Sequence, residues 1–431
     1  MEMKSIVSAL LLVLPFIALN GKAQEPLVYD ITKYGAKQGA DISKALLDAW
    51  KEASAAENAS KIVIPKGTWI LSQVRLTENK APLELEIQGT VQAYADPQKL
   101  PNKQGEWITI NYVNYFTLSG GGVLDGQGHE AWKQNDCNKN KNCVKLPIIF
   151  VNGTVDHVSI CKSGRGGILI CKISKNLSLN FINNSVIHDL TTKDSKNFHV
   201  NCISSHNVTF QRFHVSAPGE SINTDGLHLA RSSLISVLDS VIETGDDCIS
   251  IGDESSEFHI QNVTCGPGHG ISIGSLGKGA QEKDVTGIYV KNCTFKQTQN
   301  GVRVKTWPSA PATLKVSNLH FEDLIMENVS NPIIIDQEYC PWNLCDKSDP
   351  SKIQISDVSV KNVRGTSSTA EVVTFACSSG KPCQNVEIGD IDLGFIGTIG
   401  NITTICSNVK PTVTGKMNPP LCASPPAAQT A

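Results

Sequence analysis

The stretch NTDGLHLARSSLISVLDSVIETGDDCISIG, residues 223–252, decides how this chain is interpreted. It holds an acid at Asp225 and a pair of acids at Asp246 and Asp247, 21 and 22 residues further on. His269 follows 22 residues after Asp247, between two glycines. Apolar runs such as CISIG flank these polar residues, which is not typical of a solvated face. An interval of about 20–30 residues is one coil of a stacked repeat protein. The spacing therefore predicts a column of polar side chains on one face of a solenoid.

The composition limits the class of protein. The chain has 431 residues, so it can bury a large core, and its length alone allows two or three domains. Aromatic residues make up 6% of it and there are 34 glycines, a balance that favours repeated thin layers over one bulky centre. The net charge of -3 gives no global electrostatic reason to bind nucleic acid or an anionic membrane, so we expect neither partner.

The first 23 residues have the pattern of a secretory signal peptide. Lys4 precedes an apolar run over residues 6–19, and small residues at positions 21 and 23 predict cleavage after Ala23. A membrane anchor is the alternative, but a span needs about 18 or more apolar residues. We therefore expect a secreted, extracellular protein that has no membrane segment after cleavage.

Cysteine usage agrees with secretion. The 14 cysteines include five close pairs, and no CxxC occurs that would favour a zinc site over disulfides. The close pairs are Cys137/Cys143, Cys248/Cys265, Cys340/Cys345, Cys377/Cys383 and Cys406/Cys422. Nine sequons fit a glycoprotein, at Asn58, Asn152, Asn176, Asn183, Asn207, Asn262, Asn292, Asn328 and Asn401.

A four-residue unit, asparagine or similar, apolar, small polar, apolar, recurs through the second half of the chain. It begins at Asn176, Asn207, Leu234, Asn262, Asn292, Asn318, Asp357 and Asn385. The alternation within each unit indicates strands, and the recurrence indicates that they stack, with asparagines at matched turns. The fold class is all-β, a parallel β-helix forming one domain over residues 24–422, followed by a disordered tail over 423–431.

One amphipathic helix is predicted over residues 41–55, with Asp41 as its N-cap. Ile42, Ala45, Leu46 and Trp50 share its apolar stripe. A solenoid needs its first layer covered, because open strand edges and apolar faces promote aggregation. We expect this helix to cap the N-terminal end.

The polar column has a chemical interpretation. Asp246 and Asp247 are adjacent, so both can face one cleft only near a turn or bulge, which Gly245 allows. Three close carboxyls cannot all ionise freely, so the pKa of at least one should rise, as glycoside hydrolysis requires. Structural calcium or turn capping is the alternative.

Arg303 and Lys305 alternate along one strand and so point to the same face. They suggest a site for an anionic substrate, or else they pair with the aspartates. Ser272, in a G-x-S-x-G pattern, is rejected as a nucleophile because no helix follows the strand-rich segment. The glycine-rich run around Lys278 lacks phosphate-loop spacing.

The motifs NTDG, GDDCISIG, GHGISIGSLG and RVK, in this order, resemble the four signatures of glycoside hydrolase family 28, the polygalacturonases. The segments KYGAK, SIGSLGKG and NGVRVKTWP most resemble those of plant pollen-type exopolygalacturonases. The resemblance implies a right-handed parallel β-helix and a secreted exo-acting enzyme of the cell wall. Such an enzyme hydrolyses α-1,4 bonds from the ends of demethylated pectin with inversion, without metal or cofactor. We expect a monomer.

The resemblance also assigns roles to residues. Asp246 matches the general acid, Asp225 and Asp247 match the pair that activates water, and His269 matches the assisting histidine. The substrate-binding matches are Asn223, Arg303, Lys305 and Tyr339, the last in DQEYC. Inversion should separate acid and base by about 6.5–9.5 Å.

Three other functions stay open: an endo-acting polygalacturonase, a calcium-dependent pectate lyase, and an inactive wall-binding or inhibitor-binding solenoid. Residues 148–176 depart from the plant pattern as an inserted segment. It is either a further coil, since DHVSI at Asp156 imitates the repeat, or translated intron. We favour the second interpretation and expect the segment to pack poorly.

Overall fold

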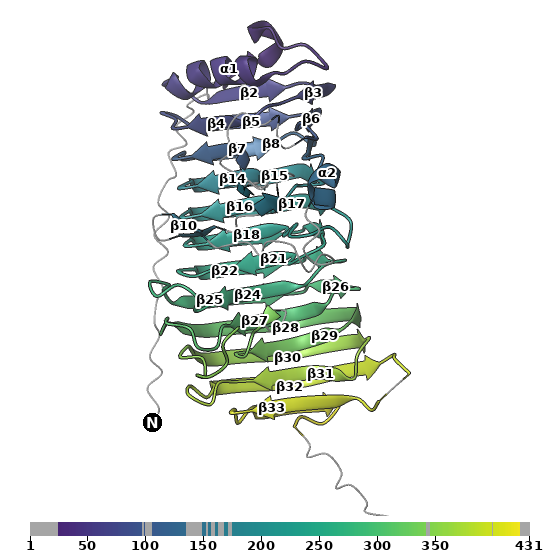
Figure 1. Ribbon diagram of the computed structural model, residues 1–431. Coiled ribbons are helices and arrows are strands. Elements are labelled where there is room, and N and C mark those ends of the chain that lie inside the picture. Colours follow the sequence, from purple (N-terminus) through teal and green to yellow (C-terminus); the bar gives the residue numbers. More distant parts are fainter. Residues whose placement is uncertain are drawn as a thin grey trace, which may run out of the picture.

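The computed structural model describes residues 25–96, 99, 106–134, 175–341, 345–398 and 400–422, and the backbone of four short strands between 149 and 170. The predicted signal peptide and C-terminal tail, and the Cys137/Cys143 pair, lie outside the described side chains. The described chain is a right-handed parallel β-helix whose coils stack from α1 at one end to β33 near the other (Figure 1). The predicted fold class is confirmed.

Two large sheets form the sides of the solenoid, and every pairing within them is parallel. Sheet 1 contains β4 (Val74–Thr77), β7 (Glu106–Asn111), β14 (Lys175–Asn180), β16 (Val200–Ile203), β18 (Leu227–Ala230), β21 (Ile249–Ile251), β24 (Ile271–Leu276), β27 (Asn300–Thr306), β29 (Asn331–Asp336), β31 (Glu371–Ala376) and β33 (Thr403–Ser407).

Sheet 2 has 19 strands. They are β1 (Leu27–Asp30), β2 (Ser60–Ile64), β3 (Thr68–Ile70), β5 (Leu83–Ile87), β6 (Thr90–Gln92), β8 (Phe116–Ser119), β9 (Val123–Asp125), β15 (Asn183–Lys193), β17 (His206–Ser216), β19 (Ser233–Leu238), β20 (Val241–Glu243), β22 (Ser256–Gln261), β23 (Thr264–Cys265), β25 (Val285–Lys291), β26 (Thr294–Lys296), β28 (Lys315–Val329), β30 (Gln354–Ser367), β32 (Gln384–Phe395) and β34 (Thr412–Asn418).

The core consists of ladders of aliphatic side chains between the two sheets. Leu229, Ile251 and Ile273 pair in register on successive strands of sheet 1, and each is fully buried. Full burial of one such side chain contributes about 1.5–3 kcal/mol. Every coil adds a layer of this kind, so the alternating pattern of the strands determines which faces remain outside for chemistry.

The repeat unit was predicted to stack on itself from coil to coil, and this is wrong for some of its members. The first residues of the units belong to two different ladders of turn residues. Strand register places Asn207, Leu234, Asn318, Asp357 and Asn385 in one ladder, and Asn262 and Asn292 in a second. Asn176 belongs to neither, because it lies in sheet 1. Each coil bends twice within sheet 2, at left-handed residues of both ladders. Both bends favour asparagine, which tolerates this backbone conformation, so sequence spacing alone does not separate them.

Helix α1 (Ser43–Ala55) covers the first coil with Ala45, Leu46 and Trp50 buried, as predicted. It begins two residues later than expected, and its cap position is Ile42. Asp41 instead forms an isolated parallel bridge with Ile70, while its carboxylate accepts the backbone N–H of Ser43 at 2.9 Å. The other helices of the described residues are the short η1 (Ile31–Tyr34) and α2 (His129–Gln134). Among the described residues, no helix has the length and apolar character needed to cross a membrane.

The described strands of the inserted segment do not form a further coil of the solenoid. Sheet 1 continues directly from β7 to β14, with Asn111 opposite Asn180. The strands in between form two separate antiparallel pairs, outside both large sheets. They are β10 (Ile149–Val151) with β11 (Thr154–Asp156), and β12 (Ile160–Lys162) with β13 (Ile168–Ile170). The interpretation as an extra coil is therefore wrong, while the expectation of poor packing falls on side chains outside the described residues.

Four of the five predicted cysteine pairs are bonded: Cys248–Cys265, Cys340–Cys345, Cys377–Cys383 and Cys406–Cys422. Each closes a loop of 5 to 17 residues. Cys202 and Cys293 are free and buried. One sequon is not a surface site: Asn176 is only 1% exposed, and its amide donates to Thr192 Oγ1 at 2.9 Å.

Candidate active site

Three coils of sheet 1 bring the predicted polar column together. Asp225, Asp247 and His269 each lie two residues before strands β18, β21 and β24, whose first residues pair in register. Adjacent parallel strands are about 4.8 Å apart, so these residues stand one above another. Asp246 lies one residue before Asp247, on the bend that follows Gly245.

Gly245 is required by a close backbone approach. A Cβ at this position would lie 1.9 Å from the carbonyl oxygen of Ser221 in the preceding coil. Any other residue would therefore push the two turns apart. The Gly245 amide also donates to Thr224 Oγ1 at 3.0 Å, and the Asp246 amide donates to Thr244 Oγ1 at 3.0 Å. These contacts hold the turn that presents both acids.

Asp247 is the most strongly paired of the acids. Its Oδ1 accepts from Arg303 Nη2 at 2.9 Å and from Ser272 Oγ at 2.8 Å, while its Oδ2 accepts from Lys305 Nζ at 2.7 Å. The carboxylate is 2% exposed. Burial alone raises its pKa, but the charges of Lys305 and Arg303 outweigh burial and lower the pKa to about 2. Asp247 is therefore ionised over the range in which proteins function.

Asp225 has the opposite electrostatic setting. It is 6% exposed, and the hydroxyl of Ser250 donates to its Oδ2 at 3.0 Å. Burial raises its pKa well above the ordinary value, and repulsion from Asp246 and Asp247 adds to the rise. The sequence prediction that one carboxyl of the three would titrate high is thus met by Asp225, next to an Asp247 that titrates low.

Asp246 is oriented by three neighbours. His269 Nδ1 lies 3.0 Å from its Oδ1, which also accepts the backbone N–H of Asp247 at 2.8 Å. The amide of Asn223 donates to its Oδ2 at 3.4 Å. The backbone N–H of His269 donates to the Asp246 carbonyl at 2.7 Å, which ties the two turns together. Six of the eight predicted site residues are thus linked by hydrogen bonds, while Asp225 lies beside them and is held by Ser250.

The expected wide separation of acid and base is not found between Asp246 and Asp247. Each offers a carboxylate oxygen within 4.8 Å of the other and of a His269 nitrogen, closer than the about 6.5–9.5 Å typical of inverting glycosidases. The reason is that the two aspartates are adjacent on one tight turn. This distance therefore does not decide the stereochemistry.

The same three residues could offer ligand atoms to a metal ion. Both Asp247 oxygens already accept from the cations Arg303 and Lys305. A divalent ion would have to compete with these two charges. The two cations beside Asp247 thus suit an anionic substrate better than a metal ion.

Tyr339 completes the site from β29, which ends three residues earlier. Its ring centre lies 5.4 Å from Lys305 Nζ and 5.9 Å from the Arg303 guanidinium carbon. Its ring also packs edge-on against Trp307 at 5.1 Å. The predicted substrate residues Arg303, Lys305 and Tyr339 therefore occupy one corner beside Asp247.

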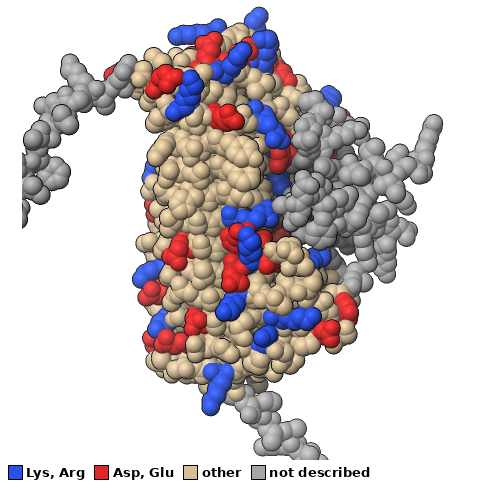
Figure 2. Space-filling model, turned by 90° about the vertical axis from the view of Figure 1, so that its left-hand side faces the viewer, with Lys and Arg blue, Asp and Glu red and all other residues tan. Residues whose placement is uncertain are grey.

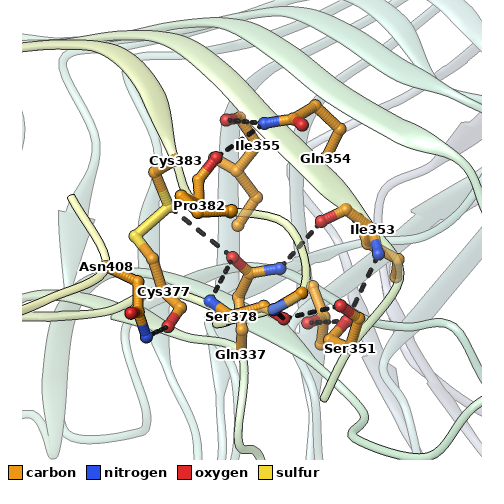
Figure 3. Close-up of a disulfide and its surroundings, with 12 residues drawn as sticks. Gln337, Ser351, Ile353, Gln354, Ile355, Cys377, Ser378, Pro382, Cys383 and Asn408 are labelled. Carbon is orange, nitrogen blue, oxygen red and sulfur yellow. Dashed lines mark hydrogen bonds between the residues drawn. A yellow bond between two sulfur atoms is a disulfide. The ribbon is translucent and has the colours of Figure 1, made fainter. Parts of the chain in front are cut away.

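A buried network holds the turn that leads to Tyr339 (Figure 3). The side-chain oxygen of Gln337 accepts the backbone N–H of Ser378 at 3.0 Å, and its nitrogen donates to the Ile353 carbonyl at 2.9 Å. The Cys377–Cys383 disulfide lies against it, with Cys383 Sγ 3.6 Å from the same Gln337 oxygen. Gln337 lies in DQEYC, but nothing in that segment marks it as a support for the turn, so sequence analysis assigned it no role.

Two serines were also missed as supports of the acids. Ser250 and Ser272 pair in register on neighbouring strands, and each donates to one aspartate, Asp225 and Asp247 respectively. Ser272 also accepts from Arg303 Nε at 3.1 Å. It lies inside β24 with no helix after it, which agrees with its rejection as a nucleophile. Alternation along CISIG and ISIG was the available signal for both serines.

The charges of the surface are of mixed sign. Figure 2 shows acidic residues at mid-height of one face with basic residues around them, below a largely uncharged area. No extended basic region appears on this face, in line with the net charge of -3.

Comparison with known proteins identifies the family. Residues 55–163 and 168–417 match the family model described as glycosyl hydrolases family 28. A polygalacturonase of Nicotiana tabacum is 49% identical over 420 residues, covering 97% of this chain and 98% of that protein. An exopolygalacturonase of Oenothera organensis is 46% identical over 384 residues, covering 89% and 98%.

A solved structure shares the fold. The exopolygalacturonase from Thermotoga maritima superposes with a TM-score of 0.71 at 18% identity, covering 91% of this chain and 92% of that one. At this identity the likeness concerns the fold alone. The matched model and the two plant relatives extend over both the solenoid and the acid-bearing coils, and the chain belongs to glycosyl hydrolases family 28.

Proposed function

We propose that this chain is a secreted exopolygalacturonase that removes galacturonate from the ends of demethylated pectin chains with inversion. The observation that carries the proposal is the corner in which Arg303 and Lys305, two cations, adjoin the acids Asp225, Asp246 and Asp247. Polygalacturonate carries a carboxylate on each ring next to the bond to be cleaved, so it needs both kinds of group. Relatives named polygalacturonase and exopolygalacturonase support the substrate class.

In the proposed reaction, Asp246 donates a proton to the glycosidic oxygen, with His269 at 3.0 Å to orient it. Asp247 and Asp225 hold the attacking water. In the free protein, Arg303 and Lys305 keep Asp247 a weak base. A substrate carboxylate competes for these cations, so binding raises the basicity of Asp247 at the step in which the water must lose a proton. Substrate recognition and base strength are thereby coupled.

The test is to size the products formed from polygalacturonate by chromatography. Exo action predicts galacturonate monomer from the first time points, whereas endo action predicts a ladder of oligomers. Inversion predicts that the first product observed by proton NMR has the β configuration at C1. Asp246→Asn, expected to be about 10²–10⁴-fold slower, controls for contaminating activity. A protein that releases no reducing sugar would support the inactive wall-binding alternative.

The pectate lyase alternative makes a different chemical prediction. Elimination would give an unsaturated product that absorbs ultraviolet light, and activity would be lost with a chelator. We expect neither result, because the cations that face Asp247 belong to the protein. Chelator-resistant release of reducing sugar without ultraviolet absorbance would support hydrolysis.

We also propose that the mature enzyme begins at Gln24, forms one domain to residue 422 and is a secreted monomer. The signal-like sequence over residues 1–23 supports secretion. N-terminal sequencing of protein secreted by plant cells tests the cleavage site, and a protein retained in the cell would contradict it. Light scattering after size exclusion tests the oligomeric state.

A further inference from the structure

The glycine-rich turn SLGKG, residues 275–279, is built against the substrate corner. Lys278 Nζ lies 4.6 Å from the centre of the Trp307 ring, and Trp307 packs edge-on against Tyr339 at 5.1 Å. The backbone N–H of Trp307 donates to the carbonyl of Leu276 at 2.9 Å. The ends of β24 and β27 are thus tied together, and Lys278 and Trp307 come from these two ends.

The turn itself is held in a defined conformation. The two oxygens of Glu282 accept the backbone N–H groups of Gly277 and Gly279, each at 2.6 Å. Gly277 has φ +109°, a conformation that would strain any residue with a side chain. Because the Glu282 carboxylate is engaged by the backbone on both sides of Lys278, the turn presents the Lys278 side chain outward, over Trp307.

Lys278 differs from the other two cations of this corner. Arg303 and Lys305 are both ion-paired with Asp247. No carboxylate of the described residues lies within ion-pair distance of Lys278. Trp307 Nε1 is likewise buried without a hydrogen-bond partner among the described groups. An ammonium without an ion pair, next to an indole N–H without a hydrogen-bond partner, is a place where an anionic ligand can bind.

The contacts form one continuous row. It runs from Asp247 to Lys305 at 2.7 Å, from Lys305 to the Tyr339 ring at 5.4 Å, then through Trp307 to Lys278. The row begins at the buried Asp247 and ends at the exposed Lys278. Two aromatic rings in contact lie between two cations, groups that suit sugar rings which each carry a carboxylate.

We propose that Lys278 and Trp307 form a second uronate subsite. It binds the galacturonate next to the one whose carboxylate is held by Arg303 and Lys305. Trp307 supplies an apolar ring for the sugar, and Lys278 supplies the charge for its carboxylate. The inference rests on the proposed function, and it assigns to the SLGKG turn a role in selecting longer chains that are free of methyl ester.

The test compares digalacturonate, which spans only the two rings at the cleaved bond, with tetragalacturonate. Lys278→Met should lower kcat/KM on tetragalacturonate by about 3- to 10-fold, mainly through KM, and leave kcat/KM on digalacturonate within about 2-fold. The matched control is Lys283→Met, which removes an exposed cation of the same loop that pairs with Glu254 at 2.6 Å. The control variant should have an unchanged kcat/KM on both substrates.

The outcomes separate this inference from the proposed function. Equal losses on both substrates, or no loss on tetragalacturonate while the wild type is active, would overturn the subsite alone. A wild-type protein that cleaves neither substrate would refute the proposed function and the subsite with it. Added salt should reduce the preference of the wild type for tetragalacturonate, because the contact is ionic. The Lys278→Met variant should lack this salt dependence.

Discussion

At the scale of single residues, the buried acids are a compromise between function and stability. Asp225 is buried and its pKa is raised, by burial first and then by the neighbouring aspartates. When the pKa of a carboxyl is higher in the folded than in the unfolded state, the folded state binds its proton more tightly. This contribution to stability is present at low pH and is lost as the pH rises through the folded pKa. Asp225 therefore destabilises the fold increasingly as pH rises above about 4.

The first prediction concerns Asp225→Asn. The variant should unfold about 1–3 °C above the wild type at pH 7, while its activity is lost. The difference in Tm should shrink towards pH 3.5, because the wild-type carboxyl is then protonated in both states. Thermal unfolding by calorimetry across this pH range is the measurement. A variant less stable than the wild type at pH 7 would contradict the electrostatic account of this position.

The second prediction concerns Lys305→Met. Burial raises the pKa of Asp247, and the Lys305 charge is the largest of the effects that bring it down to about 2. Without that charge the pKa of Asp247 must rise, so the acidic limb of the pH–kcat/KM profile should move to higher pH. KM should also increase, because the variant lacks a cation that is proposed to bind the substrate carboxylate. An acidic limb that does not shift would show that Asp247 is not the base whose pKa sets this limb. Lys291→Met, a change in an exposed pair with Glu322, is the control.

At the scale of elements, the site depends on turns that packing holds from behind. Tyr339 follows β29 by three residues, and Gln337 joins this turn to the segments that contain Ser378 and Ile353 (Figure 3). Gln337 is 1% exposed, so water could not replace its hydrogen bonds if the side chain were removed. An unsatisfied buried group costs about 1–3 kcal/mol. Gln337 is thus a positioning residue for Tyr339.

Gln337→Leu should therefore weaken both stability and substrate binding. We expect Tm to fall by about 2–4 °C and KM on oligogalacturonides to rise several-fold. The kcat should change much less, because the acids are held by other contacts. Gln354→Ala, which removes side-chain bonds to the carbonyls of Pro382 and Ile355 nearby, is the control for a general loss of packing. A fall in kcat with unchanged KM would show that Gln337 does not act through Tyr339.

At the scale of the whole molecule, some parts of the fold and of the site could be predicted from the sequence and others could not. The acids were found because register makes their spacing regular: Asp225, Asp247 and His269 each precede a strand by two residues. The turn ladders were confused because two bends per coil favour the same residue type. Lys278, Trp307 and Gln337 were not assigned to the site, since their positions depend on which strand ends lie together, which local pattern does not encode.

The inserted segment gives the last prediction. Strands β7 and β14 pair through five residue positions, from Lys175 opposite Glu106 to Asn180 opposite Asn111, without any strand between them. The described strands of the segment, β10 to β13, thus take no part in the sheet pairing of the coils on either side. A variant lacking these residues should keep a strand-dominated circular dichroism spectrum and a cooperative unfolding transition. Loss of the cooperative transition would show that the segment supports the solenoid. Peptide mapping of the natural protein, if it recovered residues 149–170, would separately refute their interpretation as translated intron, because it would establish that the source organism makes them.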